Sequence, residues 1–325
     1  MKRSVRSGLL QIVAITFLSV VASLTTVAQT QYEIGLNVGP SNFLGDLGGT
    51  QGKGETFLKD NNWSMTKVMK GVFFSVVPNE YVSIRASFNF GRLEGDDAII
   101  SPKGGLEEAR KARNSDFKSS LIELYAAAEF YPLVITEEDP TDVWHKFRPY
   151  GLVGVGVFKF NPKGSYSNSS GAQEWVELKP LRTEGQGMPE YPTRKEYSLT
   201  QINVPYGVGL KYFFNERFNM SFEIVNRITF TDYIDDVSTT YIDEAAFYNY
   251  FGAGSTTADI AAYMANKSTL LTGGVVNPDY TTGSKRGTAT NNDAYYSTTI
   301  KLGYRFGGNS SSNATNQTRC PVLRF

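Results

Sequence analysis

Apolar and polar residues alternate strictly along several stretches of this chain. In residues 81–91 (YVSIRASFNFG) the even positions, from Val82 to Phe90, are apolar, whereas most odd positions are polar or glycine. The same period of two recurs in residues 201–212 and 296–306. Successive side chains of a strand point to opposite faces, so each stretch predicts a β-strand with one apolar face.

Eight segments of this kind are predicted, with ends accurate to roughly two to four residues. They span residues 32–45, 65–77, 80–93, 115–131, 147–160, 198–213, 217–230 and 293–307. The segment at 147–160 is the least well defined, because its glycines blur which face is which. The length of the strands and the aromatic residues at their ends favour a membrane barrel over a soluble sandwich.

The connections between these segments differ in length. Residues 78–80 and 215–216 form tight turns, and 132–146 is of moderate length; the long connections are 46–64, 94–114, 161–197 and 231–292. Short turns at one end and long loops at the other are typical of outer-membrane barrels, whose turns and termini lie in the periplasm. We therefore predict an all-β, transmembrane, antiparallel up-and-down β-barrel of about eight strands, similar to OmpA and OmpX, with long extracellular loops. Closure leaves no sheet edge exposed to outer-membrane lipid.

The first residues predict export. Lys2, Arg3 and Arg6 form a basic region, and the apolar stretch 8–27 leads to a small-residue cleavage site at Ala28. We expect a signal peptide over residues 1–28 and the barrel over 29–307. No cysteine follows the cleavage site, so no lipid anchor is expected there.

Composition adds two exclusions. Lysine plus arginine and aspartate plus glutamate balance at 32 each, so global charge gives no indication of a nucleic-acid partner. No apolar run of about twenty residues follows the signal, so no membrane-spanning helix is expected. With 19 tyrosines, 21 phenylalanines and 31 glycines, the composition is typical of an all-β envelope protein.

Charged residues fall on the predicted inward face of the strands. These residues are Glu33, Arg85, Glu123, Glu129, Lys211, Glu223, Arg227, Lys301 and Arg305. Eight strands enclose an interior just wide enough for side chains, so mixed charges there most simply neutralise one another in a plugged lumen. A narrow conduit is the alternative, and a wide porin is not expected.

Candidates for catalysis or metal binding are few. His145 is the only histidine, and it lies in a predicted periplasmic turn, away from the extracellular rim where an active site is expected. Asp232, Asp235 and Asp236 lack the glycine and distal glutamate of an EF-hand, so we expect them on a solvated rim. The sequence predicts no catalytic residue, no metal, no cofactor and no small-molecule substrate.

Several motifs resemble those of a known family. They are EIGL at 33–36 with GPSNFLGD at 39–46, RLEGDD at 92–97, FKFNP at 158–162, LKPLRTEGQG at 178–187, YSLTQ at 197–201 and TFTDYIDDVSTTY at 229–241. Together they resemble the PorG family of Bacteroidetes outer-membrane proteins, over nearly the whole chain to about Phe306.

This resemblance implies a function in protein export. Members of the PorG family are outer-membrane barrels of the type IX protein secretion system, and they associate with a periplasmic ring made by the PorK lipoprotein and PorN. The resemblance also makes the aspartate-rich motif a strand-to-loop junction and not an active site. The expectation is a non-enzymatic component of the machine; a stand-alone porin or surface-binding barrel remains open as the alternative.

A distinct segment follows the last predicted strand. Residues 309–318 are rich in serine, asparagine and threonine, and residues 319–325 read RCPVLRF. We expect a periplasmic C-terminal tail over 308–325, whose candidate partner contacts are Cys320, Val322, Leu323 and Phe325. An odd cysteine in an oxidising compartment indicates an intermolecular disulfide or a free thiol. A tail without a partner is the open alternative.

Overall fold

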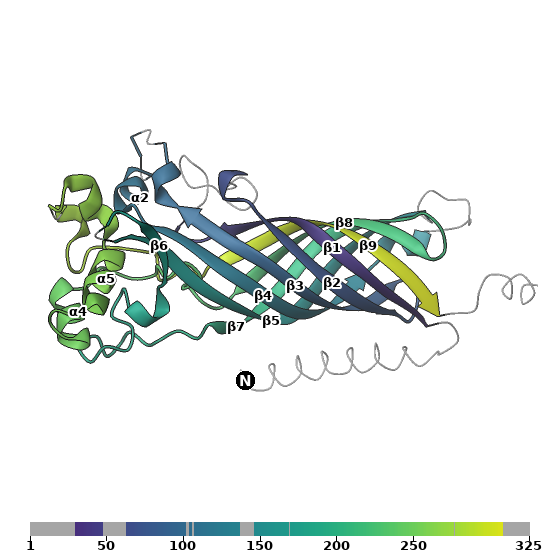
Figure 1. Ribbon diagram of the computed structural model, residues 1–325. Helices are drawn as coiled ribbons and strands as arrows, with labels where there is room; N and C mark the ends of the chain where they lie inside the picture. The colour runs from purple at the N-terminus through teal and green to yellow at the C-terminus, as the bar shows by residue number, and fades with distance from the viewer. Residues whose placement is uncertain are drawn as a thin grey trace, which may run out of the picture.

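Eight long antiparallel strands form a closed barrel (Figure 1). The computed structural model describes residues 30–47, 63–101, 104–105, 107–136, 146–168, 170–275 and 277–307. The barrel strands are β1 (Gln31–Leu44), β2 (Lys67–Val77), β3 (Val82–Asp96), β4 (Asp116–Phe130), β5 (Phe147–Ser167), β7 (Thr200–Phe213), β8 (Phe218–Thr229) and β9 (Ala294–Gly307). Each pairs with its neighbours along the chain, and β9 returns to β1. The predicted all-β up-and-down barrel is confirmed.

One strand is longer than predicted. β5 continues to Ser167, beyond the expected end at residue 160, and pairs there with the short strand β6 (Gln173–Glu177), which the sequence did not predict. The extension was not predicted because Pro162 and Gly164, residue types that are unfavourable inside a strand, lie within residues 161–167 (NPKGSYS).

The two faces of the barrel differ in polarity. On β1, Glu33 and Asn37 are buried in the interior, whereas Ile34 and Leu36 point outward and are 52% and 63% exposed. The same outward apolar face continues on the neighbouring β9, for example at Ile300. Such an outer band suits the hydrocarbon of a bilayer, and the closed sheet pairs each barrel strand with a neighbour on both sides.

Aromatic residues form a belt around the end of the barrel where β1 begins and β9 finishes. The ring pairs, with centroid separations, are Tyr32–Phe306 at 5.8 Å, Tyr32–Phe74 at 6.1 Å, Phe218–Tyr304 at 5.1 Å and Phe147–Tyr212 at 4.6 Å. Tyrosines are suited to the membrane–water interface because an apolar ring carries a polar tip. This belt marks one edge of the membrane band.

An inward glycine makes room for a large interior ring. Gly209 lies on the inner face of β7, and a Cβ there would approach within 2.4 Å of the Tyr150 ring. The glycine therefore allows Tyr150, on the adjacent β5, to reach the barrel axis.

The long loops gather at the opposite end and form a cap. It contains α2 (Glu107–Arg113), α4 (Glu244–Phe251) and α5 (Thr256–Ala265), drawn at the left of Figure 1 with β6. The short 3-10 helices of the chain are η2 (Trp63–Met65), η3 (Asp97–Ile99), η4 (Pro132–Thr136), η5 (Lys179–Leu181), η6 (Lys267–Thr272) and η7 (Pro278–Tyr280). None of the helices in the described ranges has the length and apolar character needed to cross a bilayer.

The long loop after β8 contains two short helices, α4 and α5. Gly252, with φ of 95°, ends α4, and the Ser255 side chain caps the first turn of α5. Left-handed backbone at a glycine is a common helix stop, and serine is a preferred N-cap.

An apolar core joins the cap to the barrel. Phe158 and Phe160 of β5 belong to the same buried cluster as Phe247 of α4, Met264 of α5 and Ile234. This packing closes the loop end of the barrel.

Candidate functional site

The interior of the barrel contains a network of charged side chains, here called the charge network. Its members are the nine inward residues Glu33, Arg85, Glu123, Glu129, Lys211, Glu223, Arg227, Lys301 and Arg305. Eight of them are buried, and the side chain of Arg305 is 13% exposed at the turn end. They come from β1, β3, β4, β7, β8 and β9, so the contacts cross the lumen from strand to strand.

Two carboxylates and two cations meet at the centre. Arg85 Nη1 lies 2.7 Å from Glu129 Oε1 and 2.6 Å from Glu223 Oε2. Lys301 Nζ lies 3.4 Å from a carboxylate oxygen of each of the same two glutamates. Tyr150 donates its hydroxyl hydrogen to Glu223 at 2.8 Å. Each carboxylate is therefore shared by two cations.

The network extends towards the turn end through Lys211. Its Nζ lies 3.8 Å from Glu129 and 3.3 Å from Glu33, and Arg305 Nε donates to Glu33 at 3.0 Å. Glu33 thus links the centre of the barrel to its open rim.

A second group lies towards the cap. Arg227 Nε donates to Glu123 at 3.1 Å, and Glu123 also accepts hydrogen bonds from Asn89 at 2.9 Å, Asn203 at 2.8 Å and the Tyr295 hydroxyl at 2.9 Å. Arg227 Nη1 donates to Ser297 at 2.6 Å. This carboxylate is held by four donors.

The charges of the network nearly cancel. Five cations, Arg85, Lys211, Arg227, Lys301 and Arg305, face four carboxylates, which leaves 5 − 4 = +1. Buried ions are tolerated when they are paired and hydrogen-bonded, and removing one partner leaves an uncompensated charge. With the lumen of an eight-stranded barrel occupied in this way, little aqueous cross-section remains.

Neutral partners of the network were missed by the sequence reasoning. Tyr125, Tyr150 and Tyr295 are buried beside the charges, and Asn203 donates to both Glu123 and, at 2.8 Å, Tyr295. The alternation along β4 indicates an inward position for Tyr125, because this residue lies two positions after Glu123 and therefore on the same face of the strand. Tyr125 was absent from the predicted inward set because that set contained charged residues only.

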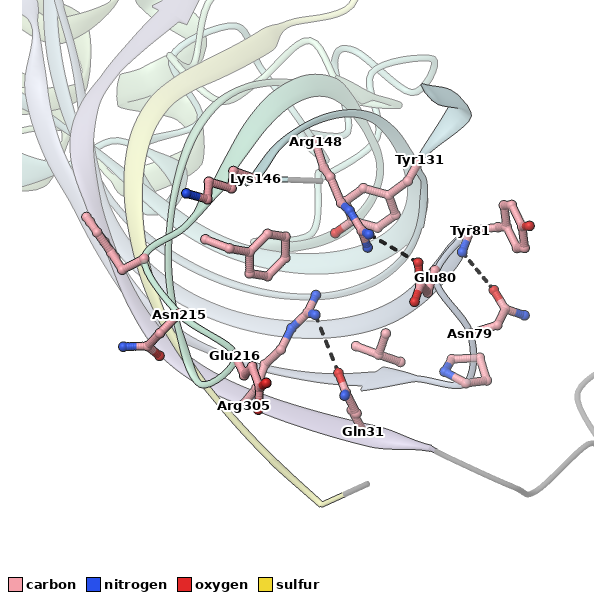
Figure 2. A pocket seen from close by; sticks show the side chains of 14 residues that line it. Gln31, Asn79, Glu80, Tyr81, Tyr131, Lys146, Arg148, Asn215, Glu216 and Arg305 are labelled. Carbon is pink, nitrogen blue, oxygen red and sulfur yellow. Dashed lines mark hydrogen bonds and ion pairs between the residues drawn. The ribbon is translucent and has the colours of Figure 1, made fainter. Parts of the chain in front are cut away.

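An open cavity of about 600 Å³ lies at the turn end, inside the ring of strand ends (Figure 2). We call it the turn-end mouth. Its lining residues are Gln31, Val77, Pro78, Asn79, Glu80, Tyr81, Tyr131, Lys146, Arg148, Phe213, Phe214, Asn215, Glu216 and Arg305. The lining combines apolar surface with both signs of charge.

Phe213 lies between two arginines of this mouth. The Arg305 guanidinium carbon is 4.3 Å from the centre of the Phe213 ring, and that of Arg148 is 5.6 Å away. Each guanidinium also donates a hydrogen bond to a glutamate: Arg305 to Glu33, and Arg148 to Glu80 at 3.1 Å. Cation–π contacts of this kind hold an aromatic floor in a fixed orientation.

The aspartate-rich motif at the end of β8 is buried, so the expectation of a solvated rim was wrong. Asp235 and Asp236 are fully buried, and Asp232 is 7% exposed. Asp235 accepts backbone hydrogen bonds from Leu47 at 2.8 Å and Val237 at 2.9 Å. The loops fold over the motif, which local sequence could not reveal.

Asp236 and Glu184 fix the cap. Asp236 has φ of 64° and accepts hydrogen bonds from the Tyr197 hydroxyl at 2.6 Å and the Thr183 hydroxyl at 2.5 Å. Glu184 accepts from the backbone N–H groups of Ser238 and Thr239, both at 2.9 Å.

Arg286 joins these two acidic residues. Its Nη1 lies 2.9 Å from Glu184 and donates to the backbone carbonyl of Asp236 at 2.6 Å. In the cap outside the lumen, Arg113 and Asp97 form a second buried pair at 2.8 Å. The motif therefore acts as a structural junction between strand, loop and cap.

Burial raises the pKa of several of these carboxyl groups. The pKa of Asp232 rises to about 7 and that of Asp236 to about 6, in the latter case despite the nearby Arg286. Burial, with the negative charge of Asp46, raises the pKa of Asp235, and burial, with the charge of Asp235, raises that of Asp293. Charged carboxylates lose solvation here without gaining enough counter-charge.

No metal centre is formed by the part of the chain that the structure describes, since no group of three or more His, Cys, Asp or Glu side chains there has a suitable arrangement. His145, the signal segment 1–28 and the tail residues Cys320, Val322, Leu323 and Phe325 lie outside the described residues. Their predicted roles stay predictions.

Comparison with solved structures finds outer-membrane barrels. A major outer membrane protein from Thermus thermophilus is 10% identical, with 85% of this chain and 99% of that chain covered and a TM-score of 0.36. Ail, the attachment invasion locus protein of Yersinia pestis, is 11% identical, with 86% and 99% covered and a TM-score of 0.34. The N-terminal β-barrel domain of Pseudomonas aeruginosa OprF is 10% identical, with 86% and 98% covered and a TM-score of 0.29.

Sequence comparison gives the family. The chain matches no curated protein. The family model described as outer membrane protein beta-barrel domain matches residues 12–249, which include every strand from β1 to β8. The chain therefore belongs to the outer membrane protein beta-barrel domain family.

Proposed function

We propose that this chain is a non-enzymatic and non-conducting component of the type IX protein secretion system. In this role the barrel holds the protein in the outer membrane, and the turn end contacts a periplasmic ring of the PorK/PorN type. Family membership supports the outer-membrane location, and the resemblance of the motifs at 178–187 and 229–241 to the PorG family supports the link to secretion. In this proposed arrangement, both termini lie in the periplasm.

The filled lumen is the observation that carries the proposal. Arg85, Glu129, Glu223 and Lys301 meet across the barrel centre at 2.6–3.4 Å, where a porin would have water. A barrel whose lumen is filled with side chains and whose loop end is capped leaves no path for solutes. We therefore place its function at the surfaces of its two ends.

The turn end offers the contact surface. The mouth there has about 600 Å³ of open space, with exposed side chains of Glu80, Lys146 and Glu216 at its rim. The β2–β3 and β7–β8 connections at this rim are short turns, so a ring protein can approach that part of it closely. We assign the tail, 308–325, with Cys320, Val322, Leu323 and Phe325, to the same contact.

Deleting the gene tests the proposal. Cargo bearing the C-terminal secretion signal is measured in the medium and in the periplasm, and the strain is complemented with the full-length chain or with a form ending at Gly307. The proposal predicts retained cargo in the deletion strain and rescue by the full-length chain. Weaker rescue by the tail-less form is expected if the tail contributes to the ring contact.

Normal secretion in the deletion strain would contradict the role in secretion. The barrel content of the outer membrane is measured in every strain, so that loss of rescue is not confused with loss of folding. Copurification of ring proteins with the full-length barrel, and not with an unrelated eight-stranded barrel, gives a matched biochemical control.

A surface-binding barrel is the second candidate. It is favoured by a cavity of about 410 Å³ in the cap, where Arg110, Lys285 and Arg286 are among the lining residues. In that role the paired change Arg110→Ser and Lys285→Ser lowers binding of polyanions to whole cells and leaves secretion unchanged.

A further inference from the structure

The turn-end mouth has an apolar floor and an acidic part of its rim. Val77, Pro78, Phe213 and Tyr131 line it, and the Phe213 ring is held between two guanidinium groups. A concave apolar surface of this size gains free energy when an apolar side chain covers it.

Two glutamates stand at the rim, and neither is deeply buried. The side chain of Glu80 is 63% exposed and shares its charge with Arg148, and Glu216 is exposed on the β7–β8 turn. By contrast, the side chains of the rim cations Arg148 and Arg305 are only 8% and 13% exposed. Each already forms an ion pair, Arg148 with Glu80 and Arg305 with the buried Glu33. The exposed charges at this end are therefore of both signs: Glu80 and Glu216 are available to a cationic ligand, and Lys146 and Arg217 lie near them.

The chain itself has a segment of matching chemistry close by. Residues 319–325 (RCPVLRF) combine the apolar side chains of Val322, Leu323 and Phe325 with the cations Arg319 and Arg324. Apolar side chains match the floor of the mouth, and arginines match the glutamates of its rim. The segment lies outside the described residues, so its chemistry is taken from sequence alone.

The connection between the two is short. β9 ends at Gly307, which pairs with Gln31, a residue of the mouth. Fourteen residues, 308–321, separate that point from Val322. A random-coil peptide of fourteen residues spans roughly 20 Å on average, so a linker of this length is long enough to return to the mouth of the same barrel. Tethering gives an effective concentration on the order of millimolar, so even weak docking is populated.

We propose that the segment 322–325 of the chain's own tail docks in the turn-end mouth. Its apolar side chains cover the floor around Phe213, and the adjacent arginines face Glu80 and Glu216. This inference goes beyond the function in secretion and applies to the isolated barrel, in which no ring protein competes for the same tail.

Cys320 makes the proposal directly testable, because it is the only cysteine of the chain. Lys146→Cys places a second thiol at the mouth, at an exposed position outside the floor and the acidic rim. Arg217→Cys places a matched thiol on the exposed β7–β8 turn, next to β9 at the same end of the barrel and outside the lining of the mouth. Both full-length proteins, purified in detergent at low concentration, are oxidised mildly and followed by non-reducing gels and by mass spectrometry of the linked peptides.

The proposal predicts an intramolecular disulfide between residues 146 and 320 that forms at least about tenfold faster than one between residues 217 and 320. Adding Val322→Ser, Leu323→Ser and Phe325→Ser to the Lys146→Cys protein is expected to slow the link by a similar factor. That triple change alters no barrel residue, so the barrel itself is unaffected.

Four outcomes would overturn the proposal. Equal rates for the two engineered thiols, or a rate unchanged by the triple serine change, would mean that the tail samples the surface without docking. A disulfide that links two chains would assign the mouth to a second copy. Absence of any link to residue 146, with free thiols verified by alkylation, would leave the mouth to another protein.

Discussion

Arg85 and Glu223 form the shortest ion pair of the charge network, with Nη1 and Oε2 2.6 Å apart on β3 and β8. Both side chains are buried, and the two strands are not neighbours in the sheet. The contact therefore ties opposite walls of the lumen together and fills the space between them.

Replacing Arg85 by methionine is predicted to destabilise the barrel strongly. As cationic partners, Glu129 and Glu223 would keep only Lys301 and, for Glu129, the longer contact to Lys211. Breaking a buried pair costs about 3–5 kcal/mol. Unfolding by urea in detergent, followed by the gel mobility of folded and unfolded barrel, measures the change.

The matched control is Arg92→Met, on the same strand. Its side chain is 60% exposed and lies 4.0 Å from Glu94, and exposed pairs contribute about 0–1 kcal/mol. Equal losses of stability in the Arg85 and Arg92 variants would contradict the structural importance of the charge network.

The Glu123–Arg227 pair is predicted to show strong coupling. Arg227→Met alone leaves Glu123 with only neutral donors, and Glu123→Leu alone leaves a buried guanidinium. The double variant is expected to lose less stability than the sum of the two single losses, by more than about 1 kcal/mol. Strict additivity in the same urea assay would show that the pair does not interact.

Arg286→Ala is predicted to open the cap and leave the barrel folded. The change removes the ion pair to Glu184 and the hydrogen bonds to the carbonyls of Asp236 and Ala265. Limited proteolysis of intact cells is expected to cut the outer loops faster, whereas Lys285→Ala, at the exposed neighbouring position, leaves the wild-type pattern. Matching patterns in the two variants would argue against Arg286 as a cap residue.

Cap stability is predicted to fall as the pH rises. Folding raises the pKa of Asp236 to about 6 and of Asp232 to about 7, from an unfolded value of about 4. The folded cap binds protons that the unfolded loops release, so this stabilisation is complete below about pH 4 and is lost as the pH rises through 6 and 7.

Hydrogen exchange of amides 234–241, corrected for intrinsic rates, measures this dependence. Faster opening is expected at pH 8 than at pH 5, and Asp232→Asn is expected to reduce the difference because asparagine does not ionise. A variant with the wild-type pH profile would show that Asp232 does not contribute.

The sequence was informative about the strands and much less so about the cap. Parity along a strand is local, so the alternation around Arg85 predicted both the strand and its inward face. Which inward residue meets which depends on register and on barrel closure. The contact of Arg85 with Glu223, and not with Glu123, could not be predicted in this way.

The cap depends on contacts between distant loops. Glu184 binds Ser238, Thr239 and Arg286, which are far from it in the chain. Nothing near Asp235 in sequence indicates that Leu47 will donate to it and that the loops will bury it. These loops lack the alternation of apolar and polar residues seen in the strands. Which of their side chains are buried therefore depends on contacts formed only in the folded protein.

Single-channel recording in planar bilayers is the most direct test of the central claim that side chains fill the lumen and that the barrel does not conduct. Purified full-length protein, reconstituted and verified as folded by its gel mobility, is predicted to give no steady conductance steps above the detergent blank. Reproducible open channels that scale with the amount of protein would contradict the filled lumen and would favour a stand-alone porin.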